Sequence, residues 1–123
     1  MILADTSVWA DHIARSDVVM VDLLEHVRIL MHPYVIAEIS LGSLRDRSSM
    51  LADLRRLPRA PVATPEETMY LIEREKLFSR GIGYVDTALL ASVRLHAGGK
   101  LWTRDKRLKK AAEDLGLAAI PGH

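Results

Sequence analysis

Short apolar runs alternate along the chain with longer stretches in which apolar residues recur every three or four positions. The short runs predict strands and the longer stretches predict amphipathic helices. Strands are expected at residues 2–4, 28–31, 100–103 and 117–120. Helices are expected at residues 7–15, around 18–24, from 33 to near 42, and at 48–57, 64–79, 85–96 and 105–115.

Particular residues mark where several of these helices begin and end. Thr64, Pro65 and Glu67 combine an N-cap, a first-turn proline and the glutamate of a capping box, which predicts a helix from there to about residue 79. Ser7 can cap the first helix, and Pro33 suits the first position of another. These signals support the helical assignments independently of the apolar pattern.

Strands separated by helices imply crossover connections and a parallel sheet covered on both faces. We therefore predict an α/β fold, a three-layer α/β/α sandwich with a central, mostly parallel sheet of four to five strands. The 123 residues fit a single domain spanning 1–123. In such sheets, ligands bind outside the carboxyl ends of the strands, so polar residues placed there are evidence about function.

Composition excludes several classes of protein. Hydrophobic residues make up 49% and charged residues 27%, the balance of a folded chain rather than a disordered one. The net charge of +1 argues against a bulk polycation, although a local basic patch remains possible. The absence of cysteine excludes disulfides, thiol nucleophiles and cysteine-rich zinc sites.

The sequence also favours a cytoplasmic protein. A cysteine-free chain suits a reducing compartment. Charges interrupt every apolar stretch before the ~20 residues that a membrane span needs. Residues 1–5 contain no basic segment and end on an acid, so we expect no signal peptide and no membrane partner.

Two acids lie just beyond predicted strands. Asp5 directly follows the first strand, and Asp105 lies two residues after the strand that ends at Thr103. Aspartate at a strand-to-helix junction is often only an N-cap, and for either residue alone that explanation is at least as good. Two such acids at the ends of different parallel strands favour a shared crevice.

Two further acids lie in apolar helical stretches. Glu38 stands beside Val35 and Ile39, whose buried face predicts that this carboxylate has a partner. Asp86 falls in the first turn of an otherwise apolar helix. The helix dipole favours a negative charge there by roughly 0.3–1 kcal/mol, which alone would explain it. Its long uncharged flanks, however, predict that this end of the helix is inside the protein.

Carboxylates that converge repel one another unless a cation or proton neutralises them. Oxygen ligands without cysteine suit Mg²⁺ or Mn²⁺, ions that promote phosphoryl chemistry. The histidines show no paired metal-ligand spacing, and we expect His12, His26 and His32 to be surface or packing residues. The residues alone therefore predict a metal-dependent phosphodiesterase with an acidic pocket.

The same segments resemble a known family. Residues 3–7, the segment around Glu38, residues 83–91 and residues 101–105 are similar to the motifs of the PIN domain. Within that family they look most like the VapC toxins of bacterial toxin–antitoxin modules, and the resemblance covers essentially the whole chain. It implies a magnesium- or manganese-dependent endoribonuclease. The positions that match the family's site residues are Asp5, Glu38, Asp86 and Asp105, with the hydroxyl neighbours Thr6 and Thr103.

The resemblance further implies roles for these residues. Asp5 and Asp86 would be the principal metal ligands, with Asp105 and Glu38 completing the shell directly or through water. Thr103 would orient a water or a ligand carboxylate, although a local backbone bond explains it about as well. VapC-like toxins cut structured RNA, commonly transfer or ribosomal RNA, and stop translation. A cognate VapB-like antitoxin blocks the site, often with a basic side chain among the acids, and family members usually form homodimers.

Basic residues next to Asp105 are candidates for holding RNA, namely Arg104, Lys106 and Arg107. A solvated helix face is the ordinary explanation of such a run, and the two interpretations are about equally good. Contacts to phosphates would give affinity and salt sensitivity but no sequence choice. A second basic cluster, which starts at Arg45 and ends at Arg59, is a weaker candidate.

Three alternatives stay open at this point. A PIN-domain nuclease of RNA processing would carry the same acids without a toxin role. A receiver-type signalling domain would need a lysine after a late strand, where this chain has Thr103, Arg104 and Asp105. A non-catalytic interaction module with this fold would have no need to retain all four acids.

Overall fold

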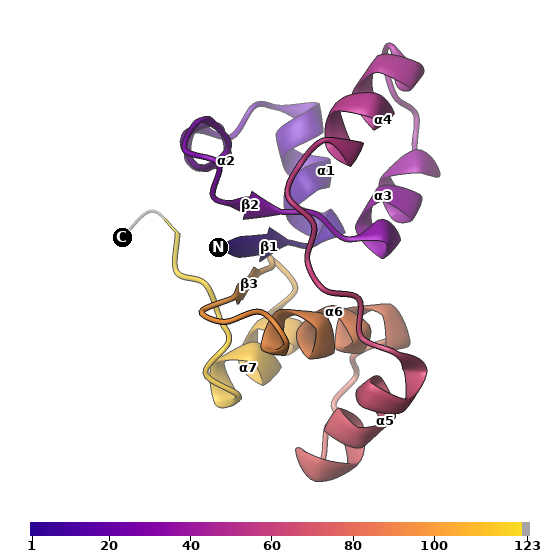
Figure 1. The fold of residues 1–123 in the computed structure, drawn as a ribbon, viewed down its shortest axis with the longest axis vertical. Coiled ribbons are helices and arrows are strands. Elements are labelled where there is room, and N and C mark those ends of the chain that lie inside the picture. The colour runs from indigo at the N-terminus through magenta and orange to yellow at the C-terminus, as the bar shows by residue number, and fades with distance from the viewer. Residues whose placement is uncertain (122–123) are drawn as a thin grey trace.

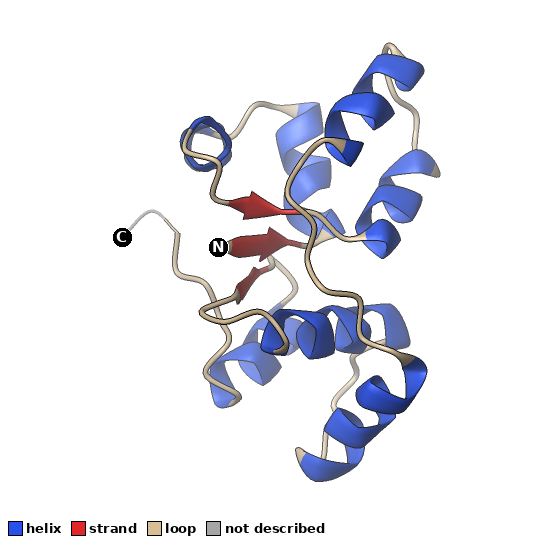
Figure 2. Cartoon of the chain, in the orientation of Figure 1, coloured by secondary structure: helices blue, strands red, loops and turns tan. Residues whose placement is uncertain are grey.

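A small parallel sheet lies at the centre of the structure, a computed structural model that describes residues 1–121 (Figures 1 and 2). The elements along the chain are β1 (Ile2–Ala4), α1 (Thr6–Ala14), α2 (Val18–Glu25), β2 (Ile29–Leu30), α3 (Pro33–Ser40), α4 (Arg47–Arg55), α5 (Pro65–Arg74), α6 (Tyr84–Arg94), β3 (Lys100–Trp102) and α7 (Lys106–Asp114). Figure 1 shows α1 to α4 on one side of the sheet and α5 to α7 on the other. The predicted α/β sandwich is confirmed.

The register of the sheet brings the ends of two strands together. The strand order is β2-β1-β3, and both pairs are parallel. Ala4 at the end of β1 pairs with Trp102 at the end of β3, and the Asp5 amide donates to the Trp102 carbonyl at 3.0 Å. Asp5 and Thr103 therefore leave the sheet side by side at its carboxyl edge.

The predicted number of strands is wrong, since the described residues contain three rather than four or five. The expected strand at residues 117–120 is reduced to an isolated bridge between Leu101 and Ala118. Only two backbone bonds attach it, from the Leu101 amide to the Leu117 carbonyl and from the Ala119 amide to the Leu101 carbonyl. Ile120 is already exposed, so the apolar pattern of this segment is not matched by burial at its end.

Helix ends follow local chemistry. The capping box of α5 is confirmed, because Thr64 Oγ1 accepts from the Glu67 amide and Glu67 Oε1 accepts from the Thr64 amide. The helix ends at Arg74 and not near 79, because Lys76 and Ser79 adopt φ angles of 52° and 61°. Helix α1 is capped by Asp5 and not by Ser7 as predicted.

A buried histidine connects two helices that carry candidate site residues. His32 Nδ1 accepts from the Tyr34 amide at the start of α3, and its Nε2 bonds to Ser92 Oγ of α6 at 3.0 Å. Ser92 Oγ also donates to the Ala88 carbonyl, which leaves Nε2–H as the donor. Burial lowers the pKa of His32 to about 4. His32 is thus a neutral packing residue that holds α3 against α6.

Within residues 1–121, no helix combines the length and the apolar character that a membrane crossing requires.

Candidate active site

Asp5 is the most constrained acid of the candidate site. Its side chain is 4% exposed and caps α1, with Oδ1 accepting from the Val8 amide at 3.3 Å. Oδ1 also accepts from the Ser7 hydroxyl, and Oδ2 accepts from the Thr103 hydroxyl. Because both carboxylate oxygens receive donors, the group is held in one orientation. The capping explanation weighed from the sequence is therefore correct, and it coexists with a fixed, acidic position at the sheet edge.

Asp105 lies in the adjoining loop, as its position after β3 predicted. It is exposed and caps α7, with Oδ1 accepting from the amides of Arg107 at 2.9 Å and Leu108 at 3.0 Å. Its own amide donates to Thr103 Oγ1 at 3.1 Å. Thr103 therefore connects the two acids, since it accepts from one residue and donates to the other.

Glu38 lies on an exposed face of α3 and has the hydrogen-bond partner that the sequence predicted. Its side chain is exposed, because Val35 and Ile39 turn the other faces of α3 into the core. The buried face expected alongside Glu38 is present, but Glu38 itself lies at the polar edge of the helix, the position that its apolar neighbours had made less favoured. The expected partner is present, since the Thr6 hydroxyl donates to Glu38 Oε1 at 2.6 Å. This bond connects α3 to the residue that follows Asp5.

Asp86 lies at the boundary between surface and core. The continuous buried run of α6 begins only at Thr87, and Tyr84 in the same turn is 47% exposed. The prediction that this helix end is inside the protein is wrong for that reason. Asp86 itself is partly buried, and burial is the largest cause that raises its pKa to about 6. The negative charges of Asp5, Asp105 and Glu38 raise it further, in that order.

The four acids thus form one electrostatic group. None of the salt bridges within the described part of the chain includes any of them. The structure brings them near enough to affect Asp86, but among residues 1–121 no three acidic or histidine side chains surround one common point closely enough to hold an ion as they stand. The group is therefore an uncompensated, oxygen-only cluster, which is chemistry that suits Mg²⁺ or Mn²⁺.

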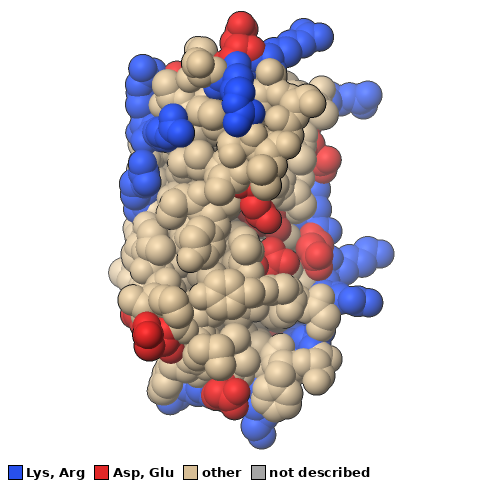
Figure 3. Space-filling model, turned by 90° about the vertical axis from the view of Figure 1, so that its right-hand side faces the viewer, with Lys and Arg blue, Asp and Glu red and all other residues tan. Residues whose placement is uncertain are grey.

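The candidate RNA-contacting residues have different surroundings. Lys106 and Arg107 are exposed in the first turn of α7, directly after Asp105. The Arg104 guanidinium is engaged in two ion pairs, with Asp11 at 3.0 Å and Asp17 at 2.9 Å. In the space-filling view, acidic side chains gather midway along one face, with basic side chains around them (Figure 3).

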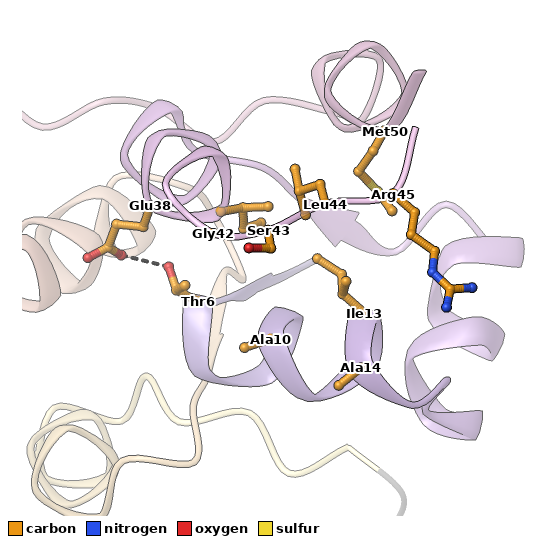
Figure 4. Close-up of a pocket in the computed structure, with 11 residues that line it drawn as sticks. Thr6, Ala10, Ile13, Ala14, Glu38, Gly42, Ser43, Leu44, Arg45 and Met50 are labelled. Carbon is orange, nitrogen blue, oxygen red and sulfur yellow. Dashed lines mark hydrogen bonds between the residues drawn. The ribbon is translucent and has the colours of Figure 1, made fainter. Parts of the chain in front are cut away.

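A groove adjoins the acidic group. It has a volume of about 670 Å³ and runs between α1, α3 and the start of α4 (Figure 4). Thr6 and Glu38 stand at one end and Arg45 at the other, and the walls between them are largely apolar. Residues on these walls include Ala10, Ile13, Ala14, Leu44 and Met50.

Sequence reasoning missed several contributors to this region. Ser7 was considered only as a cap, although its place beside Asp5 was a usable signal. Asp11 and Asp17 pair with Arg104 from about ninety positions away, and nothing in the local pattern indicates that pairing. The groove was not predicted, because its walls come from three separate segments.

Comparisons with known proteins agree on one family. The family model described as PIN domain matches residues 2–114. The chain is 47% identical over 118 residues to Ribonuclease VapC32 of Mycobacterium tuberculosis strain CDC 1551 / Oshkosh, and equally to the protein of that name from strain ATCC 25618 / H37Rv. Each match covers 96% of this chain and 95% of the relative.

A solved structure has a similar fold. The crystal structure of PAE2754 from Pyrobaculum aerophilum superposes with a TM-score of 0.66 at 17% identity. The match covers 96% of this chain and 87% of that one. At this identity the likeness bears on the fold alone.

The raised pKa of Asp86 predicts a stability change. Its charged form is disfavoured in the folded protein, so its cost is absent below the usual pKa of 3.8, grows up to about pH 6 and is complete above that. Asp86→Asn should therefore stabilise the metal-free protein by about 1 kcal/mol near neutral pH, after discounting for partial exposure. Urea unfolding in a chelator at about pH 7.5 and pH 4.5 measures the gain, which should shrink at the lower pH.

Asp114→Asn is the matched control. Bonds from Lys110 and Arg80 lower the pKa of Asp114, so this variant should lose stability at neutral pH, the opposite sign. An Asp86→Asn protein no more stable than the parent at about pH 7.5 would contradict the raised pKa of Asp86 and the combined effect of burial and neighbouring charge that explains it.

Proposed function

The chain belongs to the PIN domain family and is similar to VapC-type ribonucleases, and on this basis we propose that it is the toxin of a type II toxin–antitoxin module. We propose that residues 1–123 form one PIN-like domain. This domain is proposed to be an endoribonuclease that hydrolyses internal phosphodiester bonds of RNA and depends on Mg²⁺ or Mn²⁺. The observation that carries the proposal is the group of four carboxylates without a salt-bridge partner, three of which raise the pKa of the fourth, Asp86. The family match leaves the receiver-type alternative without support.

The donor set fits a divalent cation. Asp5 and Asp86 would be its principal ligands, and Asp105 and Glu38 would complete the shell directly or through water. When bound, the cation would polarise the scissile phosphate, lower the pKa of a water and stabilise the leaving oxygen. Its charge would also relieve the repulsion that raises the pKa of Asp86.

The chain's own residues supply fixed positions for this chemistry. Ser7 and Thr103 hold the Asp5 carboxylate, and Thr6 holds Glu38. In the proposed reaction, a water oxygen bonds to phosphorus and the bond from phosphorus to the 3′ oxygen breaks. One proton of the water ends on that oxygen, which leaves a 5′-phosphate and a 3′-hydroxyl. Prealigned acids are useful here because little reorganisation is then needed during the reaction.

Structured RNA, such as transfer or ribosomal RNA, is the proposed substrate. The exposure of Lys106 and Arg107, directly after Asp105, supports contacts of these side chains with phosphates. Contact between Arg104 and RNA would have to compete with the pairs to Asp11 and Asp17, so this residue is the weaker candidate. Cleavage of such RNA would inhibit translation, and we place the protein in the cytoplasm, where this substrate is found.

The groove offers a place for the antitoxin. We propose that a VapB-like partner lays an apolar segment along Ala10, Ile13 and Met50 and brings a basic side chain to the Glu38 end. Charge complementarity supports this occupant, because the groove ends on the carboxylate of Glu38 at one side and on Arg45 at the other. The active unit is proposed to be a homodimer that joins the antitoxin in a larger complex.

A PIN-domain nuclease of RNA processing without a toxin role is the alternative. The 47% identity to a protein named VapC32 favours the toxin. A small reading frame directly upstream that encodes an antitoxin-like protein would favour it further, and its absence would favour the alternative.

The purified chain should cleave transfer or ribosomal RNA in Mg²⁺ or Mn²⁺, and a chelator should abolish cleavage. Asp86→Asn should reduce the rate at least about 100-fold, because it removes a charged ligand from the site. The matched control is Glu66→Gln, which neutralises an acid in the first turn of α5 and should retain activity. A folded Asp86→Asn protein with undiminished metal-dependent cleavage would exclude Asp86 from the mechanism.

Ala14→Arg tests the antitoxin groove. Ala14 is exposed and lines the groove, so arginine there should obstruct a docked segment. Co-expression with the protein encoded directly upstream should no longer prevent RNA cleavage, while the free variant should cleave normally. Ala97→Arg, at an exposed position outside the groove lining, is the control. Full neutralisation of the Ala14→Arg protein would contradict the proposed docking site.

A further inference from the structure

The loop between β3 and α7 is fastened to α1 and α2 by one side chain. We propose that Arg104 is a positioning residue for Asp5, acting through the backbone of this loop rather than by touching RNA. The inference rests on the proposed function in one respect, since it takes Asp5 to be a metal ligand.

The guanidinium of Arg104 is fixed from three directions. Its Nε pairs with Asp11 Oδ2 of α1 at 3.0 Å, and a terminal nitrogen pairs with Asp17 Oδ2 at 2.9 Å. It also lies over the Trp102 ring, 5.7 Å from the centroid. Asp17 is itself fixed, because its Oδ1 caps α2 at the Met20 amide. The planar, forked group of arginine suits this arrangement, and a lysine could not reproduce it.

The backbone of the same loop orients two hydroxyl groups. The Arg104 amide donates to Ser7 Oγ at 3.0 Å, and the Asp105 amide donates to Thr103 Oγ1 at 3.1 Å. Each hydroxyl thus accepts from the loop and turns its own proton to Asp5, with Ser7 donating to Oδ1 and Thr103 to Oδ2. Two successive amides thereby set the orientation of both oxygens of one carboxylate.

Folding stability alone is a weak explanation for the ion pairs of Arg104 with Asp11 and Asp17. The Arg104 side chain is 40% exposed, that of Asp11 63% and that of Asp17 25%, and ion pairs open to solvent to this degree contribute only modestly to folding. Groups that orient a metal ligand, in contrast, typically change metal affinity by about 10-fold or more when they are removed. The two roles therefore predict different results for the same substitution.

Arg104→Gln in the full-length protein tests the inference by calorimetric titration with Mn²⁺ alone. We expect the dissociation constant to rise about 10-fold, with a melting temperature close to that of the parent. Arg80→Gln is the matched control, because Arg80 pairs with Asp114 at 2.8 Å on the far end of α7. It should lose a similar surface pair and bind Mn²⁺ normally. An Arg104→Gln protein with unchanged Mn²⁺ affinity would overturn the inference.

Amide hydrogen exchange in metal-free protein provides a readout that does not depend on the proposed function. Arg104→Gln should accelerate exchange at the amides of residues 104 and 105 and leave core strand amides protected, and Arg80→Gln should change neither. If the parent protein binds no Mn²⁺, the proposed function fails and exchange alone decides the positioning role. Unchanged protection of these two amides in Arg104→Gln would then overturn it.

Discussion

The placement of a partly buried carboxylate, Asp86, beside three others at one edge of a parallel sheet is the constraint on which the rest of the structure depends. Burial and the neighbouring charges of Asp5, Asp105 and Glu38 raise the pKa of Asp86 to about 6. A fold gains no stability from such an arrangement in the absence of a neutralising cation. The arrangement is instead suited to recruit a cation to the place where phosphate is to be cut.

The fold maintains this costly arrangement through a few specific contacts. Parallel pairing of β1 with β3 sets Asp5 beside Thr103, and hydroxyl groups hold the carboxylates of Asp5 and Glu38 in place. The neutral His32 joins α3 to α6 from within the core and so fixes the helices that carry Glu38 and Asp86. Lysine and arginine residues outside the site offset the charge of its acids. A net charge of +1 can therefore accompany a strongly acidic site.

Features that depend on residues adjacent in sequence could be predicted better than contacts between distant segments. The α/β architecture, the capping box of α5 and the positions of Asp5 and Asp105 beyond their strands follow from local patterns. The end of α5 depends on positive φ angles at Lys76 and Ser79. These angles could not be predicted from the identity of the two residues. Glu38 was placed beside a buried face because its neighbours are apolar, and a position on the polar edge was disfavoured, whereas the helix turns this side chain outward to meet Thr6. The ion pairs of Arg104 with Asp11 and Asp17 could not be predicted, because they join segments that are far apart in the sequence.

Anomalous scattering from crystals of the protein grown or soaked in Mn²⁺ tests the central claim most directly. The account predicts an anomalous peak ligated by Asp5 and Asp86, with Asp105 and Glu38 in contact with it directly or through water. Saturating Mn²⁺ that produced no peak among these four carboxylates, while the same protein cleaved RNA in a chelator, would contradict it.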